Sequence, residues 1–185
     1  FWNDFAKRDF ETWLRKSYNP GIRRLCNYWV DQMEYKGYVT RLYPFLGIAN
    51  FFLTGERSLL RCGGGWINYA IQTDGKIIIC PAMWGIKNHY VGDIFNSHPL
   101  KLKRIHMGEP CKACDILEIC GGRCLYATLA QRWSPSQYKL VCDSVRTLVD
   151  SVAAIMPRIN QLLKSGRLDA EDFQFLKYNG CEIIP

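Results

Sequence analysis

Seven of the nine cysteines stand in one ordered pattern, and thiolates are strong ligands for soft metals. The pattern reads Cys62-x12-Gly75-x4-Cys80, a gap, Cys111-x2-Cys114-x5-Cys120-x3-Cys124, a gap, and Cys142. Thiols this dense in a chain without a secretory leader bind metal more often than they form disulfides. Seven thiolates are too many for one four-ligand site and one short of two.

Two local segments can bring sulfur and backbone N–H groups to a metal group. Cys111-x2-Cys114 forms a tight loop whose sulfurs can converge. Between Cys120 and Cys124, two glycines let the backbone approach an inorganic cluster closely and donate N–H bonds to its sulfurs. The alternative is a zinc knuckle held by these four cysteines, because closely spaced cysteine quartets commonly bind zinc.

The complete pattern resembles the SPASM domain, the C-terminal extension of radical S-adenosylmethionine (SAM) enzymes that carries two auxiliary clusters. The family pattern is Cys-x(9–15)-Gly-x4-Cys, a gap, Cys-x2-Cys-x5-Cys-x3-Cys, a gap, and Cys, and the resemblance spans residues 62–142. Segments 18–22, 43–47 and 67–76 are similar to a group of radical enzymes that modify peptides.

The resemblance implies two [4Fe-4S] clusters with interleaved ligands. The first cluster would be held by Cys62, Cys80 and Cys124. The second would be held by Cys111, Cys114, Cys120 and Cys142. These clusters would serve in electron transfer and in substrate positioning, with a reductant protein and a peptide or protein substrate as partners of the full-length enzyme.

The motif that binds the radical-generating cluster, Cys-x3-Cys-x2-Cys, is absent. Cys120-x3-Cys124 begins in that way, but Ala127 occupies the third position. By resemblance, SAM and a third [4Fe-4S] cluster belong to another part of the full-length protein. We therefore expect no SAM cleavage by this chain alone, and no catalytic residue is assigned.

Length and charge narrow the function classes. At 185 residues the chain suits one domain, or a small domain with helical appendages. The net charge of +7 could suit nucleic acid, but bound clusters with their thiolates are anionic and would offset it, which disfavours that function. No run of about eighteen apolar residues exists, so we expect no membrane span. The chain lacks a starting Met and a leader, and we expect a cytoplasmic fragment of a longer protein.

The order of elements predicts an α+β fold in three parts. Residues 1–57 would be the tail of the partial (βα) barrel of a radical SAM enzyme. Residues 58–145 would form the SPASM domain, built around a small β-hairpin, and residues 146–185 a helical extension. A zinc-stabilised interaction or nucleic-acid-binding module is the alternative for the cysteine-rich part.

The first part is expected to run helix, strand, helix. Asn19 and Pro20 predict a helix start, and apolar residues then repeat at helical spacing up to a stop at Gly37. Residues 38–43 are expected to form a strand. A loop and a short apolar helix at 48–53 would follow.

The second and third parts combine a hairpin with a long helix. Asp74-Gly75 between residues 67–72 and 77–80 predicts a β-hairpin, since Gly75 supplies the positive φ of such turns. Further along, we expect a short strand at 91–95 and short helices at 99–105 and 168–173. A long amphipathic helix is predicted from apolar positions at Val141, Val145, Leu148, Val152, Ile155, Ile159 and Leu162, with its end at Gly166.

The fourth ligand of the first cluster is not evident in the sequence. Between Asn27 and Arg61 no cysteine occurs, and Glu56 stands where some family members place an extra one. Water, substrate, Glu56 or the distant Cys181 could complete this site. Cys26 lies on an apolar helix face and is interpreted as a buried structural thiol.

Overall fold

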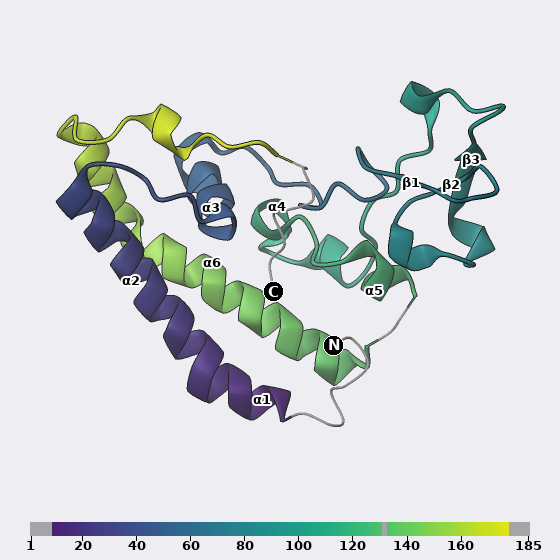
Figure 1. Ribbon diagram of the computed structural model, residues 1–185. Coiled ribbons are helices and arrows are strands. Elements are labelled where there is room, and N and C mark those ends of the chain that lie inside the picture. Colours follow the sequence, from purple (N-terminus) through teal and green to yellow (C-terminus); the bar gives the residue numbers. More distant parts are fainter. Residues whose placement is uncertain (1–8, 131–132, 178–185) are drawn as a thin grey trace.

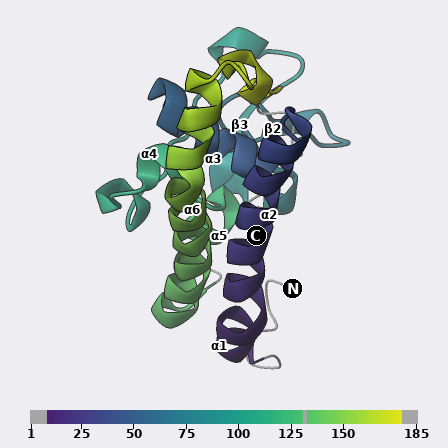
Figure 2. The ribbon, with the colours of Figure 1, turned by 90° about the vertical axis from the view of Figure 1, so that its left-hand side faces the viewer.

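Two long helices dominate the computed structural model, which describes residues 9–130 and 133–177 (Figure 1). Helix α2 spans Asn19–Lys36 and helix α6 spans Pro135–Lys164. Figure 2 shows the two helices side by side. Their C-terminal ends lie together, where Arg158 of α6 donates to Glu34 of α2 at 2.7 Å, so the two helices run parallel.

The predicted apolar stripe of α6 is confirmed. All seven of its positions are buried, namely Val141, Val145, Leu148, Val152, Ile155, Ile159 and Leu162. On α2 the buried positions are Cys26, Trp29, Val30 and Met33, whereas Leu25, which belongs to the predicted stripe, is 41% exposed. These faces form most of the main hydrophobic core, and Gly37 ends α2 at φ 71° as predicted.

The predicted helix start is confirmed in part: α2 begins at Asn19 with Pro20 in its first turn, but Asn19 is not its cap and the chain is already helical before it. Helical backbone already begins with α1 (Phe10–Trp13) and continues through a π-helical turn, Leu14–Tyr18, directly into α2. Proline has no N–H for the regular helical bond, and a π turn is one of the recognised ways to absorb such a break. Here the N–H of Asn19 reaches back five residues to the carbonyl of Leu14.

The predicted strand at 38–43 is wrong. Residues 39–42 form no strand, and helix α3 already begins at Tyr43 and runs to Thr54. Two local features explain this: the buried indole of Trp29 donates to the carbonyl of Thr40 at 2.7 Å, and Pro44 sits in the first turn of α3. The expected helix–strand–helix unit is therefore not formed, and the partial-barrel interpretation of residues 1–57 stays a prediction.

The predicted hairpin is confirmed and extends into a three-stranded antiparallel sheet. Strands β1 (Ala70–Ile71), β2 (Lys76–Ile78) and β3 (Tyr90–Asp93) lie in this order, and Gly75 adopts φ 80° in the turn. The strands are shorter than expected, and β3 starts one residue earlier and ends two residues earlier than the predicted strand. In Figure 1 the sheet lies apart from the long helices.

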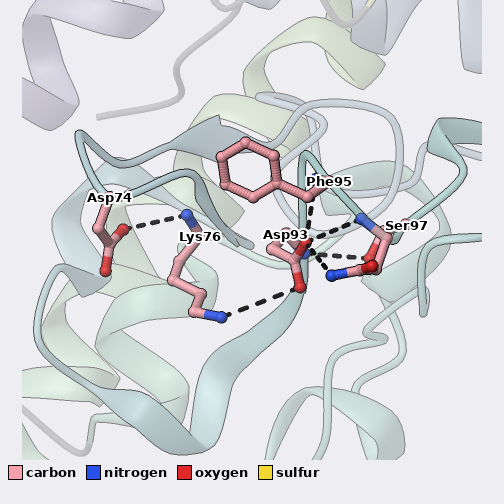
Figure 3. A network of polar contacts seen from close by, with 6 residues as sticks. Asp74, Lys76, Asp93, Phe95 and Ser97 are labelled. Carbon is pink, nitrogen blue, oxygen red and sulfur yellow. Dashed lines mark hydrogen bonds and ion pairs between the residues drawn. The ribbon is translucent and has the colours of Figure 1, made fainter.

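Polar contacts hold one end of this sheet, where the β1–β2 turn lies beside the end of β3 (Figure 3). Asp74 accepts from the N–H of Lys76 at 3.0 Å, and Asp93 accepts from the N–H of Phe95 at 3.0 Å. The Lys76 ammonium lies 3.9 Å from Asp93, while Ser97 accepts from the N–H of Asp93. These contacts hold the start of β2, the strand that leads to Cys80.

Short elements connect the sheet to the helices. Helix α4 spans Leu117–Cys120 and helix α5 spans Leu125–Leu129. Single 3-10 turns occur at Pro81–Met83, Lys87–His89, Pro99–Lys101, Cys111–Ala113 and Ala170–Phe173. The predicted helix at 99–105 is thus reduced to one turn, while the 168–173 segment has the expected cap at Asp169.

The described part of the chain is an α+β fold with one small antiparallel sheet. None of its helices combines the length and the apolar character that a bilayer crossing requires. The three-part division at residues 57 and 145 stays a prediction, since α6 spans the second boundary without a break.

Candidate metal centres

Four of the cysteines line one cavity of about 780 Å³. They are Cys111, Cys114, Cys120 and Cys142, the set predicted for the second cluster. Two come from the 3-10 turn at residues 111–113 and the position after it, one ends α4, and one lies in the third turn of α6. Segments 31 residues apart in the sequence therefore meet around one space.

Burial dominates the electrostatics of these thiols. It raises the pKa of Cys142 to about 12, and it raises the pKa of Cys120 and Cys111 as well. Backbone hydrogen bonds oppose the effect, from Gly122 toward Cys120 and from Arg123 toward Cys111. Without metal the thiols thus favour the protonated state, and metal binding must displace their protons.

Two hydroxyl groups extend this site. The hydroxyl of Tyr138 lies 3.0 Å from Cys111 Sγ and 3.0 Å from Thr128 Oγ1. Thr128 in turn donates to the backbone carbonyl of Cys124 at 3.0 Å. Burial raises the pKa of Tyr138, so its hydroxyl stays protonated and able to donate.

The other three predicted ligands form a second group. Burial raises the pKa of Cys80, a backbone hydrogen bond from Ala82 opposes this rise, and the charges of Cys124 and Cys62 add to it. Cys62 and Cys80 pack against a small core of their own, formed by Leu60, Ile79, Met83 and Leu125.

Backbone contacts with α4 hold the two groups next to each other. The N–H of Ser58 donates to the carbonyl of Glu118 at 2.7 Å, and the guanidinium of Arg61 donates to the carbonyl of Ile119 at 2.6 Å. Cys62 follows directly after this segment, and Cys120 ends α4. The structure thus places the Cys120–Cys124 loop between the two thiol groups.

Two arginines, Arg61 buried and Arg123 half-buried, supply positive charge to the thiols. Arg61 is 5% exposed, and its charge opposes the rise that burial causes in the pKa of Cys120. Arg123 interacts with the charges of Cys124, Cys120 and Cys62, and burial lowers its own pKa. A buried cation is costly unless anions lie nearby, so these arginines favour anionic occupants of both groups.

The cavity and its donors fit an iron–sulfur cluster. The four thiols line a space of about 780 Å³, which leaves room for a group larger than a single ion. Among the residues that the structure describes, no group of three or more Cys, His, Asp or Glu converges closely enough for a single ion. Thiol ligands, backbone N–H donors and an apolar surround are what cysteine-bound clusters use.

Comparisons with known proteins give one structural similarity. No protein-family model and no curated protein matches the chain. A solved structure of histidine-tagged anSMEcpe with bound AdoMet aligns with it at 18% sequence identity and a TM-score of 0.48. The alignment covers 81% of this chain and 41% of that chain, so the chain spans less than half the length of that protein.

The remaining sequence candidates have other partners or lie outside the residues that the structure describes. Glu56 is ion-paired with Lys177, whose hydrogen bond lowers the pKa of this carboxyl. Cys181 lies outside the described residues, so its role as a fourth ligand stays a prediction. Cys26 is 1% exposed in the main core, where burial raises its pKa to about 12, as expected for a structural thiol.

Sequence reasoning missed Arg61 and Tyr138. The position of Arg61, directly before the first cysteine of the pattern, is a signal that could have found it. Tyr138 lies four residues before Cys142, one helical turn away, which places both on the same face of α6. That spacing would have indicated it once Cys142 was taken as a ligand.

Proposed function

We propose that this chain is an auxiliary iron–sulfur domain of a radical SAM enzyme that modifies a peptide or protein. It binds two [4Fe-4S] clusters, the first through Cys62, Cys80 and Cys124 and the second through Cys111, Cys114, Cys120 and Cys142. The observation that carries the proposal is the cavity of about 780 Å³ lined by the four cysteines of the second set.

The surroundings of the thiols support a redox role. Hydrogen bonds to sulfur, burial and nearby charge are the means by which a protein adjusts a cluster's reduction potential. All three are present here: backbone hydrogen bonds to Cys80, Cys111 and Cys120, an apolar surround, and the charges of Arg61 and Arg123. The clusters receive and pass electrons during the radical reaction, with a cytoplasmic reductant protein as partner.

Anaerobic reconstitution tests the cluster assignment. We expect a brown protein with about four iron and four sulfide ions for each cluster. Cys142→Ala removes a ligand of the second cluster and should lose about half of the iron. Cys26→Ala is the matched control, because this cysteine lies in the main core and should leave the iron content per folded chain unchanged.

The zinc-stabilised interaction module gives the opposite result. A colourless protein with stoichiometric zinc, whose zinc content falls in Cys142→Ala, would overturn the cluster proposal. The radical SAM assignment has its own test in the gene: a Cys-x3-Cys-x2-Cys motif in the coding region upstream of this chain is expected. An open reading frame that starts with this chain would overturn it.

A further inference from the structure

Tyr138 lies between the two proposed cluster sites. Its hydroxyl oxygen is 3.0 Å from Cys111 Sγ and 3.0 Å from Thr128 Oγ1, and Thr128 donates to the carbonyl of Cys124. In the proposed ligand sets, Cys111 belongs to the second cluster and Cys124 to the first. One chain of hydroxyl groups therefore connects a ligand residue of each cluster.

Counting protons fixes the direction of this chain without metal. Thr128 has one hydroxyl proton and uses it for the Cys124 carbonyl, which can only accept. Tyr138 must then donate to Thr128, and the Cys111 thiol donates to Tyr138. All three protons thus point from the second group toward the first.

Metal binding reverses that direction. A cysteine bound to iron is a thiolate, which has no proton and can only accept. The Tyr138 proton then turns to Cys111 Sγ, and the Thr128 proton turns to the Tyr138 oxygen. The hydroxyl of Tyr138 then donates to a cluster ligand, and the hydroxyl of Thr128 strengthens this hydrogen bond by donating to the Tyr138 oxygen.

Resting on the proposed function, we propose that Tyr138 is a positioning residue that raises the reduction potential of the second cluster. Reduction adds negative charge to the cluster and its sulfurs, so a donor to Cys111 stabilises the reduced state more than the oxidised state. Thr128 strengthens this donor. The first cluster is linked to Tyr138 through Thr128 and a backbone carbonyl rather than through a ligand sulfur.

The surrounding contacts hold this donor in place. The ring of Tyr138 packs edge-on against Trp133, with centroids 5.6 Å apart. A capping box at Ser134 fixes the first turn of α6, in which Tyr138 lies. Arg146, two turns further along α6, binds Asp115 through two hydrogen bonds of 2.9 and 2.7 Å, which anchors the Cys114 loop to the same helix.

A redox titration of the reconstituted chain, followed by electron paramagnetic resonance, tests the proposal. Tyr138→Phe keeps the ring and removes the hydroxyl, so the reduction equilibrium constant of the second cluster should fall about tenfold, or about 59 mV for one electron. Thr128→Val should lower it less, in the same direction. Tyr28→Phe, on the exposed face of α2, is the control and should change neither cluster.

The outcomes distinguish a failure of the role proposed for Tyr138 from a failure of the proposed function. A second cluster that loads fully in Tyr138→Phe with an unchanged potential overturns the role of Tyr138 and leaves the proposed function standing. If Tyr138→Phe does not load the second cluster, Thr128→Val decides, and an unchanged potential there overturns the inference. Wild-type protein that takes up no second cluster overturns the proposed function and this inference with it.

Discussion

Gly121→Ala should be among the most damaging single-methyl changes in the cysteine-rich part. Gly121 follows α4 at φ +69°, and its N–H closes the helix by donating to the carbonyl of Leu117. A Cβ at this position would lie 2.0 Å from the carbonyl oxygen and 2.4 Å from the carbonyl carbon of Leu59. Both neighbours are backbone atoms of the segment that leads to Cys62, so no side-chain rotation can relieve the contact.

The magnitude has two components. A left-handed conformation costs a non-glycine residue about 1–2 kcal/mol. Steric overpacking adds about 1–3 kcal/mol, and the rigid partner places Gly121 near the upper end. Gly166 separates the components, because its φ is also +69° but a Cβ there meets nothing within 4 Å. Gly166→Ala should therefore show the conformational cost alone.

Urea unfolding of the two variants side by side measures the difference. We expect Gly121→Ala to lose at least about 3 kcal/mol and Gly166→Ala about 1–2 kcal/mol in free energy of unfolding. Iron content should fall only in Gly121→Ala, because Cys120 and Cys124 flank the displaced loop. Equal losses in the two variants, with full iron in both, would refute the reasoning.

Three further predictions concern the helices and the metal. Trp29→Phe leaves the carbonyl of Thr40 without its indole donor, and urea unfolding should show a loss of about 2–4 kcal/mol. A hydrogen bond from Arg158 lowers the pKa of Glu34. This exposed ion pair therefore stabilises the fold above the ordinary pKa of glutamate, and the stabilisation is lost as the pH falls through the pKa of Glu34 in the folded state. In thermal unfolding, Arg158→Gln should cost at most about 1 kcal/mol near pH 7 and nothing near pH 2. Iron chelation should increase hydrogen exchange across residues 58–130 while the pairing of α2 with α6 stays protected, and equal exchange in both regions would contradict this.

Where one local signal dominated, the sequence was enough to predict the structure. The spacing of seven apolar residues placed the buried face of α6, since a helix of 30 residues averages out errors at single positions. The hairpin followed from Asp74-Gly75 between two strand-like runs, because few residues other than glycine adopt the φ of 80° that Gly75 has. The cysteine spacing resembled a known pattern as a whole; four of these cysteines line one cavity, and their assignment as cluster ligands stays a prediction.

The errors occurred where a contact or a turn that composition does not reveal decided the local structure. Residues 38–43 have strand-like composition, but the indole of Trp29, more than ten residues away, takes the carbonyl of Thr40. Asn19 and Pro20 have the composition of a helix start, yet a π turn carries the helix through them. Tyr138 was overlooked for the same reason, since its partner Cys111 lies 27 residues away.

The main hydrophobic core and the core beside Cys62 and Cys80 differ in size, and this difference predicts a structural role for the proposed clusters as well. The main core joins α2, α3 and α6 through nineteen buried residues and includes no cysteine of the first set. The core beside Cys62 and Cys80 has only four buried residues, Leu60, Ile79, Met83 and Leu125. A core of that size offsets little of the conformational entropy of the loops around it, and under the proposed function metal–sulfur bonds would supply the difference. We therefore expect the long helices to fold by hydrophobic burial without metal, and the sheet and its loops to need the proposed clusters for a fixed arrangement. Cys142 and Tyr138 lie on α6, so the proposed second cluster would be the one attached to the helical part of the molecule.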